Sequence, residues 1–71
     1  MQKIAITTEY IKLDSFLKLA GVTDSGGQSK VLIKDGLVLV DGEVCTMRGK
    51  KLYPGAMVQV AENVYEVVEG E

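Results

Sequence analysis

Apolar and polar residues follow two different periods in the first third of this 71-residue chain. Within residues 2–8, Ile4 and Ile6 stand two apart, and this spacing predicts a half-buried strand. Four later apolar residues then follow the i, i+3, i+4, i+7 spacing of one helical face: Leu13, Phe16, Leu17 and Ala20. Gly21 follows this stripe and predicts a helix end in the left-handed conformation.

A second helix is predicted to begin at Ser25. Gln28 stands three residues later and completes an S-x-x-Q capping-box pattern. The apolar run at 31–33 supplies the buried side, and Asp35-Gly36 ends the helix. Two interpretations of the intervening Gly26-Gly27 pair remain open. The glycines either let an anion approach the positive end of the helix, or relieve crowding where two helices meet.

The second half of the chain predicts strands joined by tight turns. LVLV-DG-EVCT, from residue 37, indicates a hairpin with a type I′ turn at Asp41-Gly42. MRGKKLYPG follows as a basic loop that closes on Pro54-Gly55, which suits a type II turn. Strands are expected at 56–61 and 64–68 with a turn at Glu62-Asn63, and residues 69–71 are expected to fray. The order β-α-α-β-β-β-β predicts a single α+β domain over 1–71, with two short helices packed on a small antiparallel sheet.

Composition removes most catalytic chemistry. Histidine is absent and Cys45 is the only cysteine, so a zinc site, a Ser–His pair and a Cys–His pair lack ligands or partners. No pair of acidic residues has neighbours that would tune one to donate and the other to accept a proton in general acid–base catalysis. We therefore expect no enzyme, no catalytic residue, no metal and no cofactor. Cys45 is interpreted as a small buried hydrophobe. A chain without a disulfide, a signal peptide or a membrane span is expected to be cytoplasmic.

The net charge of −2 is unevenly distributed. Residues 1–51 carry all eight basic and six acidic side chains, a balance of +2, whereas residues 52–71 carry four acids only, a balance of −4. Charges interact over about 8–10 Å at physiological salt, so local sign matters more than the total. A basic face on an acidic protein is therefore possible.

An ordered set of short elements between Lys12 and Val60 resembles the S4 domain. Those elements are Lys12-Leu13-Asp14, Leu17, Gly21, Ser25, Leu32-Ile33, Gly36, Val38-Leu39-Val40-Asp41-Gly42, Leu52, Gly55, Val58 and Val60. The core match covers 12–60, and the whole chain is most similar to small stand-alone bacterial S4-domain proteins of the YaaA/YbcJ type. The resemblance implies an αL-motif RNA-binding surface and a connection to ribosomal RNA or ribosome assembly.

The resemblance also implies where that surface lies. In S4 domains the two helices and the start of the hairpin form the nucleic-acid face, which points to Lys12, Ser25, Gln28, Lys30 and Lys34, with Asp41 at the hairpin tip. This chain departs from the family pattern in three places. Gly26 replaces an arginine, Asp41 replaces the hairpin asparagine, and Ala56 replaces an acid.

The full predicted site adds the glycine pair and the basic loop to those positions. The candidate RNA-binding residues are Lys12, Ser25, Gly26, Gly27, Gln28, Lys30, Lys34, Arg48, Lys50 and Lys51. Lys30 and Lys34 are four apart and share a helix face. Ser25 is expected mainly to cap its helix. Because the four aromatics offer little for base stacking, we expect recognition of the shape and backbone of structured ribosomal RNA. The protein is expected to be a monomer.

Two other function classes fit parts of the sequence. A protein–protein adaptor with an S4-like fold and little RNA affinity is favoured by the acidic total, Gly26 and Asp41, and should expose an apolar or mixed patch. A β-grasp sulfur carrier is suggested by the valine-rich strands. Such carriers end in Gly-Gly, whereas this chain ends Glu69-Gly70-Glu71, so that interpretation fails.

Overall fold

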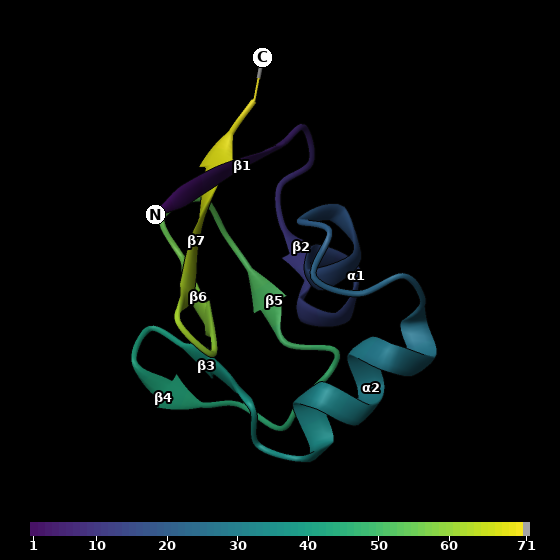
Figure 1. Cartoon of the computed structure of the whole chain (residues 1–71). Helices are drawn as coiled ribbons and strands as arrows, with labels where there is room; N and C mark the ends of the chain where they lie inside the picture. The colour runs from purple at the N-terminus through teal and green to yellow at the C-terminus, as the bar shows by residue number, and fades with distance from the viewer. Residues whose placement is uncertain (71) are drawn as a thin grey trace.

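The computed structural model describes residues 1–70 and shows two helices beside a five-stranded sheet (Figure 1). The elements are β1 Gln2–Ile6, β2 Ile11–Lys12, α1 Leu13–Leu19, α2 Gly26–Lys34, β3 Val38–Val40, β4 Glu43–Val44, β5 Lys51–Leu52, β6 Met57–Val60 and β7 Asn63–Glu69. The predicted α+β order is confirmed, and the two-residue strands β2 and β5 are additional to it.

Both helices form for the reasons that their sequences indicate. In α1 the stripe residues Leu13, Phe16 and Leu17 are fully buried, and Gly21 follows with φ +78°. At the start of α2, the Ser25 hydroxyl accepts a hydrogen bond from the Gln28 N–H at 3.2 Å, as predicted. The return bond of the capping box is different. The Gln28 side-chain oxygen accepts from the N–H of Asp24 at 2.8 Å, one residue before the cap.

The sheet is mixed: the predicted antiparallel pairing holds for β3–β4, β3–β6 and β6–β7 and was wrong only for the added β1–β7 pair. Its order is β1-β7-β6-β3-β4, and β1 pairs with β7 in parallel, with Ile4 opposite Val67. Hairpin neighbours must be antiparallel, but almost the whole chain separates β1 from β7, and such a long connection allows parallel pairing. The two ends of the chain therefore close the fold by lying side by side.

The C-terminal residues are more ordered than expected. Glu69 belongs to β7, and the Gly70 N–H donates to the Ile6 carbonyl at 2.7 Å, so the frayed end predicted for 69–71 was wrong at these two positions. A side chain at Gly70 would place its Cβ 3.1 Å from that same carbonyl oxygen, which favours glycine here. Glu71 lies outside the described residues.

Residues with positive φ lie in three of the tight turns. Asp41 and Gly42 have φ values of +52° and +88°, which confirms the type I′ hairpin turn. Gly55 has φ +102° in a turn closed by the Ala56 N–H and the Tyr53 carbonyl at 3.0 Å. The last turn was predicted one residue late. It is formed by residues 61–62, because Ala61 takes the positive φ of +54° and Asn63 already pairs within the sheet.

One core joins the helices to the sheet. Its fully buried side chains come from both helices and from β3, β5, β6 and β7. The ring of Phe16 in α1 meets the ring of Tyr65 in β7 edge-on, with centroids 6.5 Å apart. Cys45 is half-buried against this core, just after β4, rather than fully buried within a strand. Within residues 1–70, no helix is long and apolar enough to cross a membrane.

Candidate nucleic-acid interface

The basic loop is fixed to the first turn of α1. The Leu13 N–H donates to the Lys50 carbonyl at 2.9 Å, and the Asp14 N–H donates to the Arg48 carbonyl at 3.1 Å. The residue before this helix is Lys12, which makes no side-chain cap. Loop carbonyls therefore satisfy N–H groups that a helix normally leaves without partners at its start. The same bonds hold the basic loop beside Lys12, the residue before α1.

Pairing of β2 with β5 then sets two lysines face to face. Lys12 lies directly opposite Lys51, and both are exposed. Like charges at directly opposed positions destabilise an antiparallel pair by a few tenths of a kcal/mol. An anion such as a phosphate would relieve this repulsion. The structure thus brings together four predicted residues from distant parts of the chain: Lys12, Arg48, Lys50 and Lys51.

The second helix docks on the same residue of α1. The buried Ser29 hydroxyl donates to the Asp14 carbonyl at 3.2 Å and lies 2.6 Å from the Thr23 hydroxyl. The N–H of Asp14 holds the basic loop, and its carbonyl holds α2. The two basic segments, 48–51 and α2, therefore converge on the first turn of α1.

Lys30 and Lys34 are exposed side by side on α2, next to its buried face. The Gly26-Gly27 pair lies on the same side of the helix. A Cβ at Gly26 would meet nothing within 4 Å, and one at Gly27 would meet only the Ser25 hydroxyl at 3.8 Å. The interpretation that these glycines relieve crowding between helices was therefore wrong. They leave open space at the start of α2, whose first turn has no acidic residue.

Two predicted site residues, Ser25 and Gln28, use their side chains in hydrogen bonds at the start of α2. The Ser25 hydroxyl caps α2, as expected, and the Gln28 side chain bonds to the Asp24 N–H. Residues two apart point to different sides of a helix, so Gln28 faces away from Lys30. It lies instead over an apolar hollow with Val22, Val31 and Leu32. The structure does not bring Gln28 together with the lysines.

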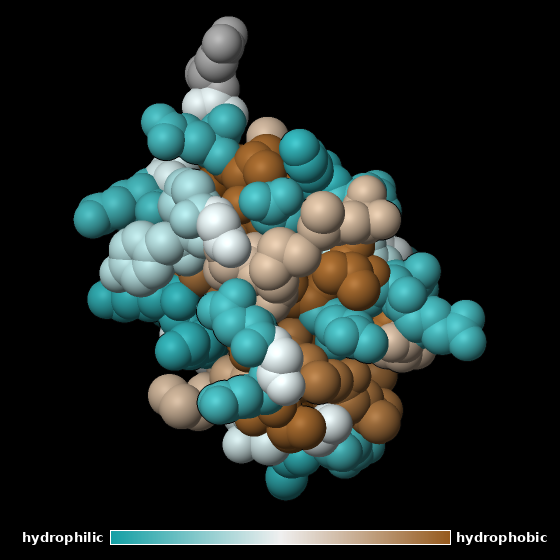
Figure 2. Space-filling view, turned by 90° about the vertical axis from the view of Figure 1, so that its left-hand side faces the viewer, coloured by the Kyte–Doolittle hydropathy of each residue, from teal (hydrophilic) through white to brown (hydrophobic). Residues whose placement is uncertain are grey.

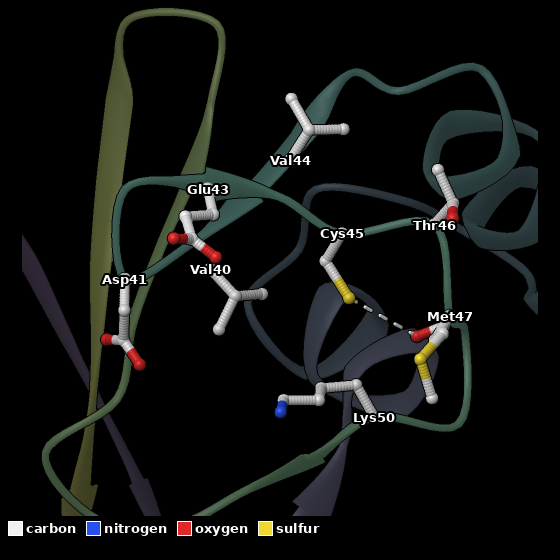
Figure 3. Close-up of a pocket in the computed structure, with 8 residues that line it drawn as sticks. All are labelled: Val40, Asp41, Glu43, Val44, Cys45, Thr46, Met47 and Lys50. Carbon is white, nitrogen blue, oxygen red and sulfur yellow. Dashed lines mark hydrogen bonds between the residues drawn. The ribbon is translucent and has the colours of Figure 1, made fainter.

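Asp41 at the hairpin tip is tied to the sheet. Its N–H donates to the Met57 carbonyl at 2.8 Å, and its carboxylate accepts from the Met57 N–H at 2.9 Å. Figure 3 shows this carboxylate and that of Glu43 across a hollow from the Lys50 side chain. The Lys50 ammonium thus faces two acidic groups, whose negative charge disfavours an anion beside it.

Sequence reasoning missed three residues of this region. Ser29 gave one signal, because it stands four before Ile33, on the stripe that should be apolar. Tyr10 and Tyr53 gave none, since no local pattern predicts the β2–β5 pairing that sets their rings 5.9 Å apart. Among residues 1–70, no group of three or more His, Cys, Asp or Glu side chains is placed to hold a metal ion.

Comparison with known proteins identifies the family. The family model described as the S4 domain matches residues 4–68. The chain is 47% identical over 57 residues, 80% of each chain, to a Bacillus subtilis (strain 168) protein named "Probable ribosome maturation protein RlbA". It is 39% identical over 59 residues, 83% of this chain and 84% of the other, to "Putative RNA-binding protein YbcJ" of Escherichia coli (strain K12).

Solved structures agree with these sequence relatives. The solution structure of YbcJ from E. coli, described as revealing an αL motif involved in RNA-binding, superposes with a TM-score of 0.73. The two chains are 35% identical, and the match covers 96% of this chain and 87% of that one. The family model over residues 4–68, the identity to both relatives and the superposition lead to one conclusion: this chain belongs to the S4 domain family.

Proposed function

We propose that this chain is a non-catalytic module that binds RNA. The observation that carries the proposal is the convergence of α2 and the 48–51 loop on Asp14, which brings the two basic segments to the first turn of α1. The names of its relatives, an RNA-binding protein and a ribosome maturation protein, support the same function. The finer proposal is a cytoplasmic monomer that binds structured ribosomal RNA during ribosome assembly.

The proposed contacts are to phosphates. Lys30 and Lys34 project from a capped helix, and Lys12 and Lys51 from a paired ribbon, so their backbones are held at fixed separations. Cations held at fixed spacing can match the phosphate spacing of an A-form helix without reading its bases. Recognition of this kind follows RNA shape and is sensitive to salt.

A titration against a structured ribosomal RNA fragment at several salt concentrations tests the proposal. Single-stranded RNA and duplex DNA serve as controls. With about four to six phosphate contacts, we expect log K to fall against log salt with a slope of about −3 to −5, and a preference for structured RNA. A failure to bind any of the three nucleic acids at low salt would remove the proposed function.

Single lysine variants locate the site. Lys30→Ala and Lys51→Ala should each weaken binding and reduce the magnitude of the slope by about 0.7–0.9. Lys3→Ala is the matched control, because Lys3 is also exposed but lies in β1 opposite Glu66. If the three variants bind alike, the phosphate contacts lie elsewhere.

A protein adaptor remains the second candidate, and one observation favours it. Figure 2 shows apolar side chains gathered low on the sheet side of the molecule, at the height of β3 and β4 in Figure 1. Val44 in β4 and Leu37, which precedes β3, are 59% and 51% exposed. Val44→Ser should leave RNA binding unchanged. A parent protein that binds no RNA but co-purifies with a partner in a Val44-dependent manner would favour the adaptor.

A further inference from the structure

An aromatic pair, with Tyr53 exposed and Tyr10 half-buried, lies at the end of the β2–β5 ribbon. Tyr10 and Tyr53 stand one position beyond the paired residues Ile11 and Leu52, and their rings are tilted at 49° with centroids 5.9 Å apart. The ammonium of Lys51 lies 4.9 Å from the centre of the Tyr10 ring. Two residues separated by 43 positions in the sequence thus form one cluster with a cation.

Strand alternation places this cluster on the outer side of the ribbon. Successive side chains of a strand point to opposite faces. Leu52 is buried, so its neighbours on either side, Lys51 and Tyr53, point outward. On the partner strand the same alternation turns Tyr10 and Lys12 away from the core. Two aromatic rings and two ammonium groups therefore share one exposed face.

The two rings have different surroundings. Tyr10 is half-buried, with Tyr53 beside it and an ammonium group over its ring. Tyr53 is 48% exposed, far more than the core aromatics Phe16 and Tyr65 at 0% and 8%. A cross-strand aromatic pair stabilises a ribbon whether or not a ligand binds. That role leaves much of the Tyr53 ring open to solvent.

We infer that Tyr53 is a stacking platform for one unpaired base of the bound RNA, with Tyr10 as the residue that positions its ring. Lys12 and Lys51 meet the phosphates next to that base. The inference rests on the proposed RNA-binding function and specifies its ligand: an RNA helix interrupted by a bulge, a loop or an end. Splayed bases stack on aromatic side chains in this way, and paired bases cannot.

The composition of the face favours RNA over a protein partner. Lysine is depleted from the buried centres of protein interfaces, whereas Lys12 and Lys51 lie opposite each other two positions along the ribbon from this aromatic pair. Their mutual repulsion calls for an anion between or beside them. RNA alternates bases and phosphates, so a single RNA strand offers an aromatic ring and a negative charge at neighbouring positions.

Three RNA hairpins test the inference: one fully paired, one with a single bulged nucleotide, and one with an abasic residue at the bulge. We expect the parent protein to bind the bulged hairpin about tenfold more tightly than the other two. Tyr53→Leu should lose this preference yet bind the paired hairpin as the parent does. Tyr53→Phe, which keeps the ring, should retain the preference.

Intrinsic fluorescence gives an independent signal, because the chain has three tyrosines and no tryptophan. The bulged hairpin should quench tyrosine emission more than the abasic hairpin does, and Tyr53→Leu should abolish that difference. Thermal unfolding of each variant confirms that it folds.

The outcomes separate this inference from the proposed function. Lys30→Ala should weaken all three hairpins equally and preserve the preference for the bulge. Equal affinity of the parent for all three hairpins, or an unchanged preference in Tyr53→Leu, would overturn the stacking platform while RNA binding stands. A parent that binds none of them at low salt overturns both.

Discussion

At the scale of single residues, Asp14 and Ser29 connect the two basic segments. The main chain of Asp14 bonds to the loop on one side and to α2 on the other, and Ser29 supplies the second of these bonds from a fully buried position. A buried hydroxyl without a partner is costly, so this contact fixes the angle at which α2 meets α1. The relative placement of the lysines depends on it.

Ser29→Ala should lower the free energy of unfolding by about 1–3 kcal/mol, because it leaves the buried Thr23 hydroxyl and the Asp14 carbonyl without this partner. Urea denaturation followed by circular dichroism measures the change. Ser15→Ala, on the exposed side of α1, is the control and should cost less than about 0.5 kcal/mol. Equal effects of the two substitutions would contradict the structural role given to Ser29.

Asp41 combines a turn conformation, a hydrogen bond and an unfavourable charge. Asp41→Asn keeps the left-handed residue and an oxygen that can accept from the Met57 N–H, so we expect the free energy of unfolding to change by less than about 0.5 kcal/mol. Removing one negative charge near Lys50 should tighten RNA binding about twofold.

Asp41→Ala separates these effects. It also removes the charge, but it loses the bond to Met57 and strains the positive φ, so it should cost about 1–3 kcal/mol of unfolding free energy. RNA titration and urea denaturation of both variants provide the test. Weaker RNA binding by a stable Asp41→Asn protein would show that the carboxylate itself contributes to binding.

At the scale of elements, the start of α2 combines a good cap with poor helix formers. Ser25 satisfies one N–H group, while Gly26 and Gly27 add flexibility without filling any space. Local propensity and this arrangement disagree, and such disagreements are expected at functional sites. Close approach of a phosphate to the backbone is one reason to keep glycine there.

Gly27→Ala should stabilise the domain by up to about 1 kcal/mol, because alanine is the better helix former and its Cβ has room. The same Cβ should weaken RNA binding by occupying the open surface. Urea denaturation and RNA titration measure the two effects. Ser25→Ala is the control, since it should lower stability by about 1 kcal/mol without adding volume. Unchanged RNA affinity in Gly27→Ala would assign the glycines no part in binding.

At the scale of the whole molecule, three acidic side chains lie on the sheet side, away from α2. Glu62, Glu66 and Glu69 lie on β7 and the turn before it, across the molecule from α2 (Figure 1). The molecule measures 33 × 22 × 18 Å, several Debye lengths of about 8 Å along its longest axis. A net charge of −2 is therefore compatible with a basic surface on the helical side.

Closure of the fold depends on the two chain ends. Ile6 is 4% exposed in β1, and its carbonyl accepts the Gly70 N–H. Ile6→Ala should cost about 2–5 kcal/mol of unfolding free energy, a large share of what a domain of this size has. Urea denaturation measures this loss. Hydrogen exchange at Gly70 should accelerate with it.

Thr7→Ala, at the exposed position that follows β1, is the control for this closure and should change the free energy of unfolding by less than about 0.5 kcal/mol. A small effect of Ile6→Ala, similar to that of Thr7→Ala, would mean that the parallel β1–β7 pair is not needed for the core.

Elements whose signals are local could be predicted from the sequence. Hydrophobic spacing predicted both helices, the Ser25 cap fixed the start of α2, and Asp41-Gly42 fixed the hairpin, because each of these depends on residues within about four positions. Ordered short elements also predicted the S4 family. Where a turn depended on an unusual conformation of Ala61, local pattern placed it one residue late.

The pairings between distant residues became visible only in the folded chain. The parallel β1–β7 pair, the β2–β5 ribbon, the Ser29–Asp14 bond and the Tyr10–Tyr53 cluster join positions that no periodicity relates. Each depends on burial and hydrogen-bond satisfaction in the complete fold, since unpaired polar groups in the interior are too costly to leave. The residue types of the candidate site could therefore be named from the sequence, whereas their grouping around Asp14 came from the fold.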